Sequence, residues 1–288
     1  MKNIRKYLPY LLLLFLVIST IYICYFLFGH QNNTNILKVA YLDIGQGDSI
    51  YIEAPNGKQM LIDAGPGPVV LSKLSEVMPF ADRSLDLVLT THTDADHIGG
   101  FPSVLDKYKV GQIVENGADN TTKTYKNLEQ KIKEKNIKKL VARRGMKIIL
   151  DKDKNIYFDV LFPDRDISNL DSNDGSIVGK LIYGNESFMF TGDATKLTEN
   201  LIMDNESKTT LHSNVLKLGH HGSKHSTSDV WLKNVNPDIA IISAGLKNRY
   251  GHPHQEVIDK LNDIHIPYLS TYQKGTIIFK TDGMSISY

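Results

Sequence analysis

The hydrophobic pattern divides the chain into one long apolar run and a region of short alternating segments. Residues 8–28 contain no charged side chain and are mostly Leu, Ile, Phe, Val and Tyr. A run of about 20 apolar residues matches the hydrocarbon thickness of a bilayer. The pattern therefore predicts one transmembrane helix over residues 8–28 and a folded domain over residues 36–288, joined by a polar linker at 29–35.

Basic residues set the orientation that we expect for this helix. Lys2, Arg5 and Lys6 precede the apolar run, whereas residues 29–37 contain no Lys or Arg. By the positive-inside rule, residues 1–7 stay in the cytoplasm and the domain is exported. A cleaved signal peptide is the alternative. The run is longer than a signal-peptide core, and residues 26–28 lack small-residue cleavage spacing, so we expect an uncleaved signal anchor at the cell membrane.

Short apolar segments bounded by turn residues predict the elements of the domain. The expected strands are 36–42, 49–53, 59–62, 85–90, 156–162, 176–183, 187–191, 215–218, 239–243 and 275–280. The expected helices are 69–78, 101–108, 122–136, 197–203 and 255–263. Pro55-Asn56-Gly57 indicates a hairpin between the second and third strands. Early hairpins followed by strand–helix alternation favour a mixed α/β sandwich with the sheets inside and the helices outside.

Composition excludes several classes of protein. The 288 residues carry 33 Lys+Arg against 32 Asp+Glu, and 41% of them are hydrophobic, which is typical of a globular protein rather than a disordered, collagen-like or polytopic membrane protein. The single cysteine, Cys24, excludes an intramolecular disulfide framework and any cysteine-based metal cluster. Without residues 1–35 the net charge is −2, so no global positive field attracts the domain to nucleic acid.

One local basic tract departs from this balance. Residues 126–147 contain nine Lys or Arg against Glu129 and Glu134. Two interpretations remain open at this point. The tract is either the solvated face of a helix or a patch that meets a polyanion or the membrane surface.

Ligand-type side chains follow the expected strand 85–90. His92, Asp94, Asp96 and His97 lie within six residues, and Gly99-Gly100 then allows the chain to turn into a helix. Histidine and carboxylate ligands at this density favour divalent cations, and two cations fit better than one because a single ion rarely uses so many neighbouring residues. The segment therefore predicts a metal centre.

This segment resembles the metallo-β-lactamase superfamily, whose signature is His-x-His-x-Asp-His, with Asp94 in place of the second histidine. Together with residues 43–49, Thr191-Gly192-Asp193 and residues 218–223, it is similar to the metallohydrolase domain of ComEC-type DNA-uptake proteins. The similarity covers about residues 39–278. It implies an α/β fold of the αββα four-layer sandwich type, preceded here by one transmembrane helix.

The resemblance also assigns roles to residues. His92 and Asp94 are expected at the first metal, and Asp96 with His97 at the second. Asp193 is expected to bridge both metals. His220 is expected to be another ligand of the second metal, with His221 as the alternative for that place. Asp63 is expected to orient the ligands through its carboxylate.

The histidine pattern departs from that of the family. None of the ten histidines lies between His97 and His212, where the superfamily usually supplies another first-site ligand. Asn173, Asp174 and Ser176 are the candidates in that interval. Oxygen ligands are harder than imidazole, so the cofactors expected are two divalent metal ions, Mn²⁺ or Zn²⁺.

A metal-activated hydroxide is the nucleophile that such a centre implies. Asp96 and His252 are the expected catalytic residues, His252 holding a phosphoryl oxygen or protonating a leaving group. Contacts to a substrate phosphate are expected from Ser223, Lys224, Arg249, Gln46 and Asp48.

The function expected is a membrane-anchored, extracytoplasmic dinuclear metallohydrolase that cleaves phosphodiesters, with single-stranded DNA as the substrate that the resemblance implies. A separate channel or envelope complex is the expected protein partner. Two alternatives stay open. One is an envelope phosphate-ester esterase of the phosphorylcholine type, and the other is a non-catalytic, metal-stabilised binding module.

Overall fold

The structure, a computed structural model, describes residues 2–28 and 35–288, and its side chains are described for residues 7–23 and 35–288. Its internal contacts define two compact units, Met1–Thr34 and Asn35–Tyr288. The first unit contains helix α1, Lys2–Phe28. Within the described ranges, no helix has both the length and the apolar character needed to cross a membrane. Most of the expected linker, residues 29–34, lies outside the described residues.

Two β-sheets form the centre of the second unit. The first sheet has the order β15 (Ile286–Ser287), β14 (Ile277–Thr281), β1 (Leu37–Tyr41), β2 (Ile50–Glu53), β3 (Gln59–Ile62), β4 (Ser84–Thr90), β5 (Lys109–Glu115), β6 (Lys138–Val141). The second has the order β13 (Tyr268–Ser270), β12 (Ile239–Ile242), β11 (Val215–Lys217), β10 (Glu186–Phe190), β9 (Val178–Tyr183), β8 (Ile156–Phe162), β7 (Lys147–Asp151).

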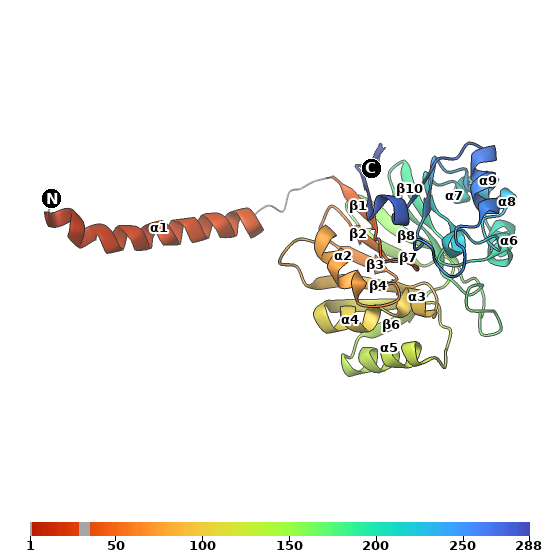
Figure 1. Ribbon diagram of the computed structural model, residues 1–288, viewed down its shortest axis with the longest axis horizontal. Helices are drawn as coiled ribbons and strands as arrows, with labels where there is room; N and C mark the ends of the chain where they lie inside the picture. Colours follow the sequence, from red (N-terminus) through yellow and green to blue (C-terminus); the bar gives the residue numbers. More distant parts are fainter. Residues whose placement is uncertain (1, 29–34) are drawn as a thin grey trace. The chain divides into compact units, whose positions relative to one another are not determined.

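Helices cover the outer face of each sheet (Figure 1). The helices that follow strands of the first sheet are α2 (Val69–Val77), α3 (Ala95–Ile98), α4 (Phe101–Lys107) and α5 (Lys123–Glu134). Those of the second half are α6 (Lys196–Asn205), α7 (Lys208–Leu211), α8 (Asp229–Val235), α9 (Gln255–Asp263) and α10 (Thr271–Lys274), with a 3₁₀ turn at Gly219–Gly222. The order helix, sheet, sheet, helix confirms the expected α/β sandwich of four layers.

Alternation along the strands explains why the sheets stack. In β1, Val39 and Tyr41 belong to the core between the sheets, whereas Ala40 packs against the outer helices. Successive strand residues point to opposite faces, so a strand that is apolar on both faces must be buried on both. Tyr41 meets the Phe190 and Phe279 rings at centroid distances of 6.1 and 5.9 Å, which ties the two sheets together.

The predicted elements appear near their expected bounds, and the Pro55-Asn56-Gly57 turn closes with Gly57 N donating to Ala54 O at 2.9 Å. The sequence pattern did not predict β5, β6, β7, β13, β15 or the helices α3, α7, α8 and α10. Among these, β6 and β7 are edge strands that each begin with an exposed lysine, Lys138 and Lys147. Lysines are common on edge strands, because they discourage pairing with other chains, and they hide the apolar pattern.

Parallel strand order places the candidate ligands together. β3 pairs in parallel with β4, and β11 pairs in parallel with both β10 and β12. The carboxyl ends of parallel strands meet at one edge of a sheet, which is where ligand sites form in open α/β sheets. Asp63, His92, Asp193 and His220 all follow such strand ends.

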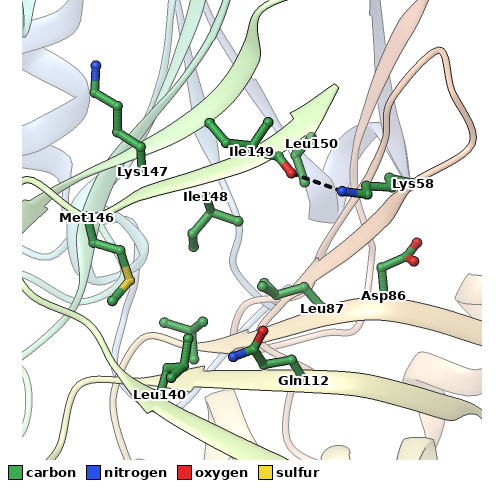
Figure 2. Close-up of a pocket in the computed structure, with 11 residues that line it drawn as sticks. Lys58, Asp86, Leu87, Gln112, Leu140, Met146, Lys147, Ile148, Ile149 and Leu150 are labelled. Atoms are coloured by element: carbon green, nitrogen blue, oxygen red, sulfur yellow. Dashed lines mark hydrogen bonds between the residues drawn. The ribbon is translucent and has the colours of Figure 1, made fainter. Parts of the chain in front are cut away.

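A cavity of about 420 Å³ opens elsewhere, between the edge strands of the two sheets. Figure 2 shows aliphatic walls from Leu87, Leu140, Ile148 and Leu150, with Lys58 donating to Ile149 O at 3.4 Å at the rim. Its lining contains none of the predicted site residues.

Candidate metal centre

Asp193 lies at the centre of a group of histidines. Its carboxylate oxygens lie 3.2 Å from His97 Nε2, 3.4 Å from His221 Nε2, 3.7 Å from His220 Nε2 and 4.0 Å from His92 Nε2. Asp193 and the histidines at 92, 97 and 221 are buried. The structure therefore brings the predicted bridging carboxylate to the middle of the predicted imidazoles.

Two further carboxylates stand on different sides of Asp193. Asp94 Oδ2 lies 3.8 Å from His92 Nε2, whereas Asp96 Oδ2 lies 3.4 Å from His221 Nε2. Asp94 thus pairs with His92, and Asp96 pairs with His221 rather than with its expected partner His97. By these distances, His221 rather than His220 accompanies Asp96. The number of metal ions stays a prediction.

The hydrogen bonds of the histidines fit metal ligation. His97 Nδ1 donates to Asp63 Oδ2 at 2.8 Å, and His221 Nδ1 donates to Ser243 O at 2.8 Å. The hydroxyl of Thr91 donates to Asp63, so His92 Nδ1 is the donor in its 3.0 Å contact with that hydroxyl. Each Nδ1 thus carries a proton, and each Nε2 presents its lone pair to the centre.

Buried atoms without partners show the same fit. In the described part of the chain, His92 Nε2, His97 Nε2, His221 Nε2 and Asp193 Oδ1 are buried without a hydrogen-bond partner. Leaving such groups unpaired is costly, and polar atoms that converge in this way point to a bound ion. Ligand atoms of Asp48, His97, Asp193 and His221 also lie within 4.8 Å of one another. The residues present therefore fit divalent cations.

Asp63 orients the segment that carries His92 and His97. Its carboxylate accepts from Thr91 N at 2.8 Å, from Thr91 Oγ1 at 2.6 Å and from His97 Nδ1. Its backbone has φ 55°, a left-handed conformation that costs a non-glycine residue of the order of 1–3 kcal/mol. Such strain persists only where surrounding contacts fix it. Asp63 thus stands where the family resemblance places an orienting carboxylate.

The turn after β11 is strained in the same way. His220 and His221 have φ 50° and 56°, and Gly222 follows with φ 82°. Two consecutive left-handed residues direct both imidazoles toward Asp193 from one short turn, which an extended strand end cannot do because neighbouring side chains alternate. The expectation that only one of the pair faces the centre is therefore wrong.

The loop between β1 and β2 reaches the centre through glycine. A Cβ on Gly47 would lie 2.0 Å from Asp96 O, so only glycine allows this approach. Asp48 N donates to Asp96 O at 3.3 Å, and the Asp48 carboxylate lies 3.4 Å from His221 Nδ1. Asp48 was expected to contact a substrate phosphate. It is buried instead, and its carboxylate belongs to the group of atoms that could hold a metal ion.

Lys217 was not predicted as part of the site. Its side chain is fully buried, and its Nζ lies 2.6 Å from Asp48 Oδ2 while donating to Gly192 O and Leu218 O at 3.0 Å each. These three partners belong to the three loops that carry Asp48, Asp193 and the histidine pair. The signal available in the sequence was one lysine inside the apolar run 215–218.

Electrostatics in the centre favour positive charge. Burial opposes protonation of His97 and His221, but Asp193 and further carboxylates raise the pKa of both imidazoles well above the usual value. Burial likewise opposes ionisation of Asp193, and His221 with His97 hold its pKa well below the usual range. The same carboxylates favour a cation at the Nε2 atoms, where it would take the place of the Nε2 protons.

The interval that was expected to supply another ligand is placed differently. Ser176 Oγ accepts from Asp193 N at 3.2 Å, and the Asp174 carboxylate accepts from the hydroxyl of Thr195. Their hydrogen bonds support the Asp193 loop. Asn173 keeps a buried Oδ1 with no partner among residues 35–288, so it remains the candidate ligand of the three.

Residues expected at the substrate divide into exposed and buried sets. Ser223 is buried and its hydroxyl accepts from His225 N at 3.3 Å, which removes it from the expected phosphate contacts. Lys224 and Arg249 are exposed. The His252 ring lies 5.2 Å from that of His220, and burial together with His220 and His221 lowers the pKa of His252 to about 4. His252 is therefore a neutral imidazole at the edge of the centre.

The basic tract lies on α5, on β6 and in the turn before β7. Helix α5 buries Tyr125, Leu128 and Ile132, and exposes lysines on the opposite face. This confirms that part of the tract is the solvated face of a helix. Contact of this face with a polyanion or a membrane stays a prediction.

A four-layer α/β sandwich whose strands end at histidines and aspartates is typical of metal-dependent hydrolases. Residues 42–245 match the metallo-β-lactamase superfamily. The chain belongs to this superfamily, as the residues around His92 predicted.

Three relatives extend the comparison. The chain is 34% identical over 264 residues to ComE operon protein 3 of Bacillus subtilis (strain 168), covering 84% of this chain and 33% of the relative. It is 30% identical to Recombination protein 2 of Haemophilus influenzae, covering 78% and 26%, and 30% identical to Competence protein ComA of Neisseria gonorrhoeae, covering 85% and 32%. The chain thus spans about a third of the length of these relatives, and the expected similarity to ComEC-type proteins is confirmed.

Solved structures share the fold at low identity. The metallo-β-lactamase fold protein YhfI from Bacillus subtilis aligns with a TM-score of 0.56 at 11% identity, covering 85% of this chain and all of YhfI. The metallo hydrolase Igni18 from Ignicoccus hospitalis aligns with a TM-score of 0.53 at 14% identity, covering 85% and 98%. These likenesses support the fold.

Proposed function

We propose that the chain is a phosphodiesterase that uses two divalent cations, Mn²⁺ or Zn²⁺, and acts on single-stranded DNA outside the cytoplasm. The observation that carries this proposal is the position of Asp193 between two sets of ligands. His92 and Asp94 hold one cation, and Asp96, His97 and His221 hold the other. Bound there, the cations acidify water and offset the negative charge that develops on a phosphate under attack.

The surrounding residues have separate tasks in this proposal. Asp63 and Ser243 fix the Nδ1 protons of the ligand imidazoles, so that the Nε2 atoms face the cations. His252 is neutral near pH 7 because its pKa is about 4, so its N–H is available to a phosphoryl oxygen. Arg249 and Lys224 are exposed at loops beside the centre and supply positive charge to the diester.

DNA is favoured as the substrate by the names of the relatives. Competence protein ComA and Recombination protein 2 have names that refer to competence and recombination. Both words describe the handling of DNA. Association with a separate channel or envelope complex is a further part of the proposal.

Anchoring by residues 8–28 is part of the proposal. The side chains of residues 11–18 on α1 are between 47% and 68% exposed, and all of them are apolar. Ser19 and Thr20 donate their hydroxyls to Leu16 O at 2.9 and 2.7 Å, which lowers the cost of placing them in hydrocarbon. The chain is expected to stay in the membrane fraction during alkaline extraction. An alkaline phosphatase fused after residue 288 is expected to be active. Extraction into the soluble fraction contradicts anchoring.

Hydrolysis assays test the proposed activity. The purified chain in detergent, loaded with Mn²⁺ or Zn²⁺, is expected to cleave bis(p-nitrophenyl) phosphate and labelled single-stranded DNA. Asp96→Ala is expected to lose both activities, whereas Asp106→Ala, which changes an exposed carboxylate on α4, keeps them. Preference for p-nitrophenyl phosphorylcholine over DNA favours the esterase alternative. Retained activity in Asp96→Ala shows that the assignment of the centre is wrong.

A further inference from the structure

The loop from Ser243 to His254, between β12 and α9, carries exposed apolar side chains beside the metal centre. Tyr250 is 46% exposed and Leu246 is 69% exposed. This loop also holds His252, which is only half-buried. An aromatic ring left open to solvent at the edge of a catalytic centre is available to a flat ligand group.

Arg249 fixes the position of this ring. Its guanidinium carbon lies 4.7 Å from the Tyr250 ring centroid, and its Nη2 donates to Tyr250 Oη at 2.5 Å. The loop thus presents a guanidinium stacked on an aromatic ring, and both side chains are exposed.

A row of rings leads from Tyr250 to Asp193. The Tyr250 and His252 rings lie 5.7 Å apart and within 20° of parallel. The His252 ring lies 5.2 Å from that of His220, whose Nε2 is 3.7 Å from Asp193. A ligand group at Tyr250 is therefore separated by the rings of His252 and His220 from Asp193.

Gln46 offers a polar contact beside the same loop. Its Oε1 accepts from Gly245 N at 3.1 Å, which fixes the carboxamide against residues 244–246. Its Nε2 is buried and has no hydrogen-bond partner in the described part of the chain. Gln46 therefore places an amide donor without a described partner beneath the surface of this loop.

We propose that Arg249, Tyr250 and Gln46 form a nucleobase subsite, with Tyr250 as the stacking surface. The inference rests on the proposed phosphodiesterase function and names the substrate more closely, as a nucleotide whose base is unpaired. A nucleotide carries a planar base beside its phosphate, and bases stack on aromatic rings or guanidinium planes in single-stranded complexes. A base inside a duplex has both faces covered by its neighbours, so this subsite selects single strands.

Three esters with the same leaving group test the subsite in the metal-loaded chain. They are thymidine 5′-(p-nitrophenyl phosphate), methyl p-nitrophenyl phosphate and p-nitrophenyl phosphorylcholine. The measured quantity is the ratio of kcat/KM for the thymidine ester to kcat/KM for the methyl ester. Tyr250→Ala is expected to lower this ratio about 5- to 150-fold, which corresponds to about 1–3 kcal/mol of stacking at 1.36 kcal/mol per tenfold change.

Matched variants separate stacking from loop structure. Tyr250→Phe keeps the ring and is expected to keep the ratio, whereas Tyr250→Leu keeps apolar bulk without a flat face and is expected to lose most of it. Phe80→Ala removes an aromatic ring that is 87% exposed elsewhere, and is expected to leave the ratio unchanged.

Fluorescence anisotropy of the metal-free chain gives a readout without turnover. Oligo-dT is expected to bind more tightly than an abasic oligonucleotide, and Tyr250→Ala to remove the difference.

Several results overturn the inference. Equal loss of both esters in Tyr250→Ala assigns Tyr250 to loop structure. A wild-type ratio near one, with the methyl ester still cleaved, removes the base subsite and leaves the phosphodiesterase function standing. A Tyr250-dependent preference for the choline ester identifies a cation subsite instead. Failure of the wild type to cleave any ester ends the proposed function and this inference with it.

Discussion

Replacing Lys217 with methionine removes a buried charge while keeping an unbranched side chain of similar length. The Lys217 Nζ lies 2.6 Å from Asp48 Oδ2 and donates to two carbonyl oxygens at 3.0 Å. Without it, the Asp48 carboxylate stays buried and loses its strongest partner. Burial raises the pKa of Asp48, and Lys217 is the first of the groups that lower it.

The expected cost follows from burial. Removing one partner of a buried ion pair destabilises a protein by about 3–5 kcal/mol, because the other charge is left uncompensated. A domain is stable by about 5–15 kcal/mol, so the variant still folds while the loss is large enough to measure. Lys217→Met is therefore expected to lower the free energy of unfolding by about 3–5 kcal/mol, and to weaken metal binding about 10- to 100-fold.

Urea unfolding, followed through the fluorescence of the buried Trp231, measures the free energy. Lys131→Met is the matched control, because Lys131 Nζ also lies 2.6 Å from a carboxylate, that of Asp106, but on the exposed helix layer. Exposed pairs contribute little, so this variant should unfold like the wild type. If Lys217→Met is no less stable than Lys131→Met, the reasoning is refuted. It is also refuted if the losses of unfolding free energy caused by Lys217→Met and Asp48→Asn simply add in the double variant, because the losses of two interacting residues are not additive.

Two further predictions concern pH and the histidine pair. Partial burial raises the pKa of Asp82, but hydrogen bonds from Ser84 and Gln59 outweigh it and lower the pKa in the folded chain. The ionised carboxylate therefore stabilises the fold above the pKa of the unfolded chain, about 3.9. This stabilisation is lost as the pH falls through the lower pKa of the folded chain. The difference in unfolding free energy between wild type and Asp82→Asn should therefore shrink between pH 6 and pH 3, and a constant difference contradicts this. His221→Ala should weaken Mn²⁺ or Zn²⁺ binding, measured by calorimetry, more than His220→Ala, because His221 is fully buried and its Nδ1 is fixed by a backbone carbonyl. Equal losses contradict this order.

Much of the fold was predictable because local pattern and burial agree. Strands such as 156–162 are apolar, end in turn residues and lie in the interior of a sheet rather than at its edge, so their pattern is clear. The edge strands β6 and β7 were not predictable, because only part of each is buried and their lysines resemble the solvated helix before them.

The metal centre was predictable in part for a similar reason. His92, Asp94, Asp96 and His97 lie on one short segment after a strand, where spacing alone indicates ligation. The pairing of Lys217 with Asp48 depends on a contact between distant segments, which no local spacing reveals. The turn at His220 and His221 depends on two consecutive residues in the left-handed region, which is uncommon for residues other than glycine. Contacts that the fold creates between loops were therefore the part that sequence could not supply.

The central claim is that Asp193 stands between two cation sites, and metal stoichiometry tests it directly. Titration of the metal-free chain with Mn²⁺ or Zn²⁺, with bound metal counted by mass spectrometry, is expected to give two ions per chain. His92→Ala and His221→Ala should each leave one ion, and Asp193→Ala should lose both at the same free metal concentration. A single ion in the wild type, or two ions retained in Asp193→Ala, contradicts the claim.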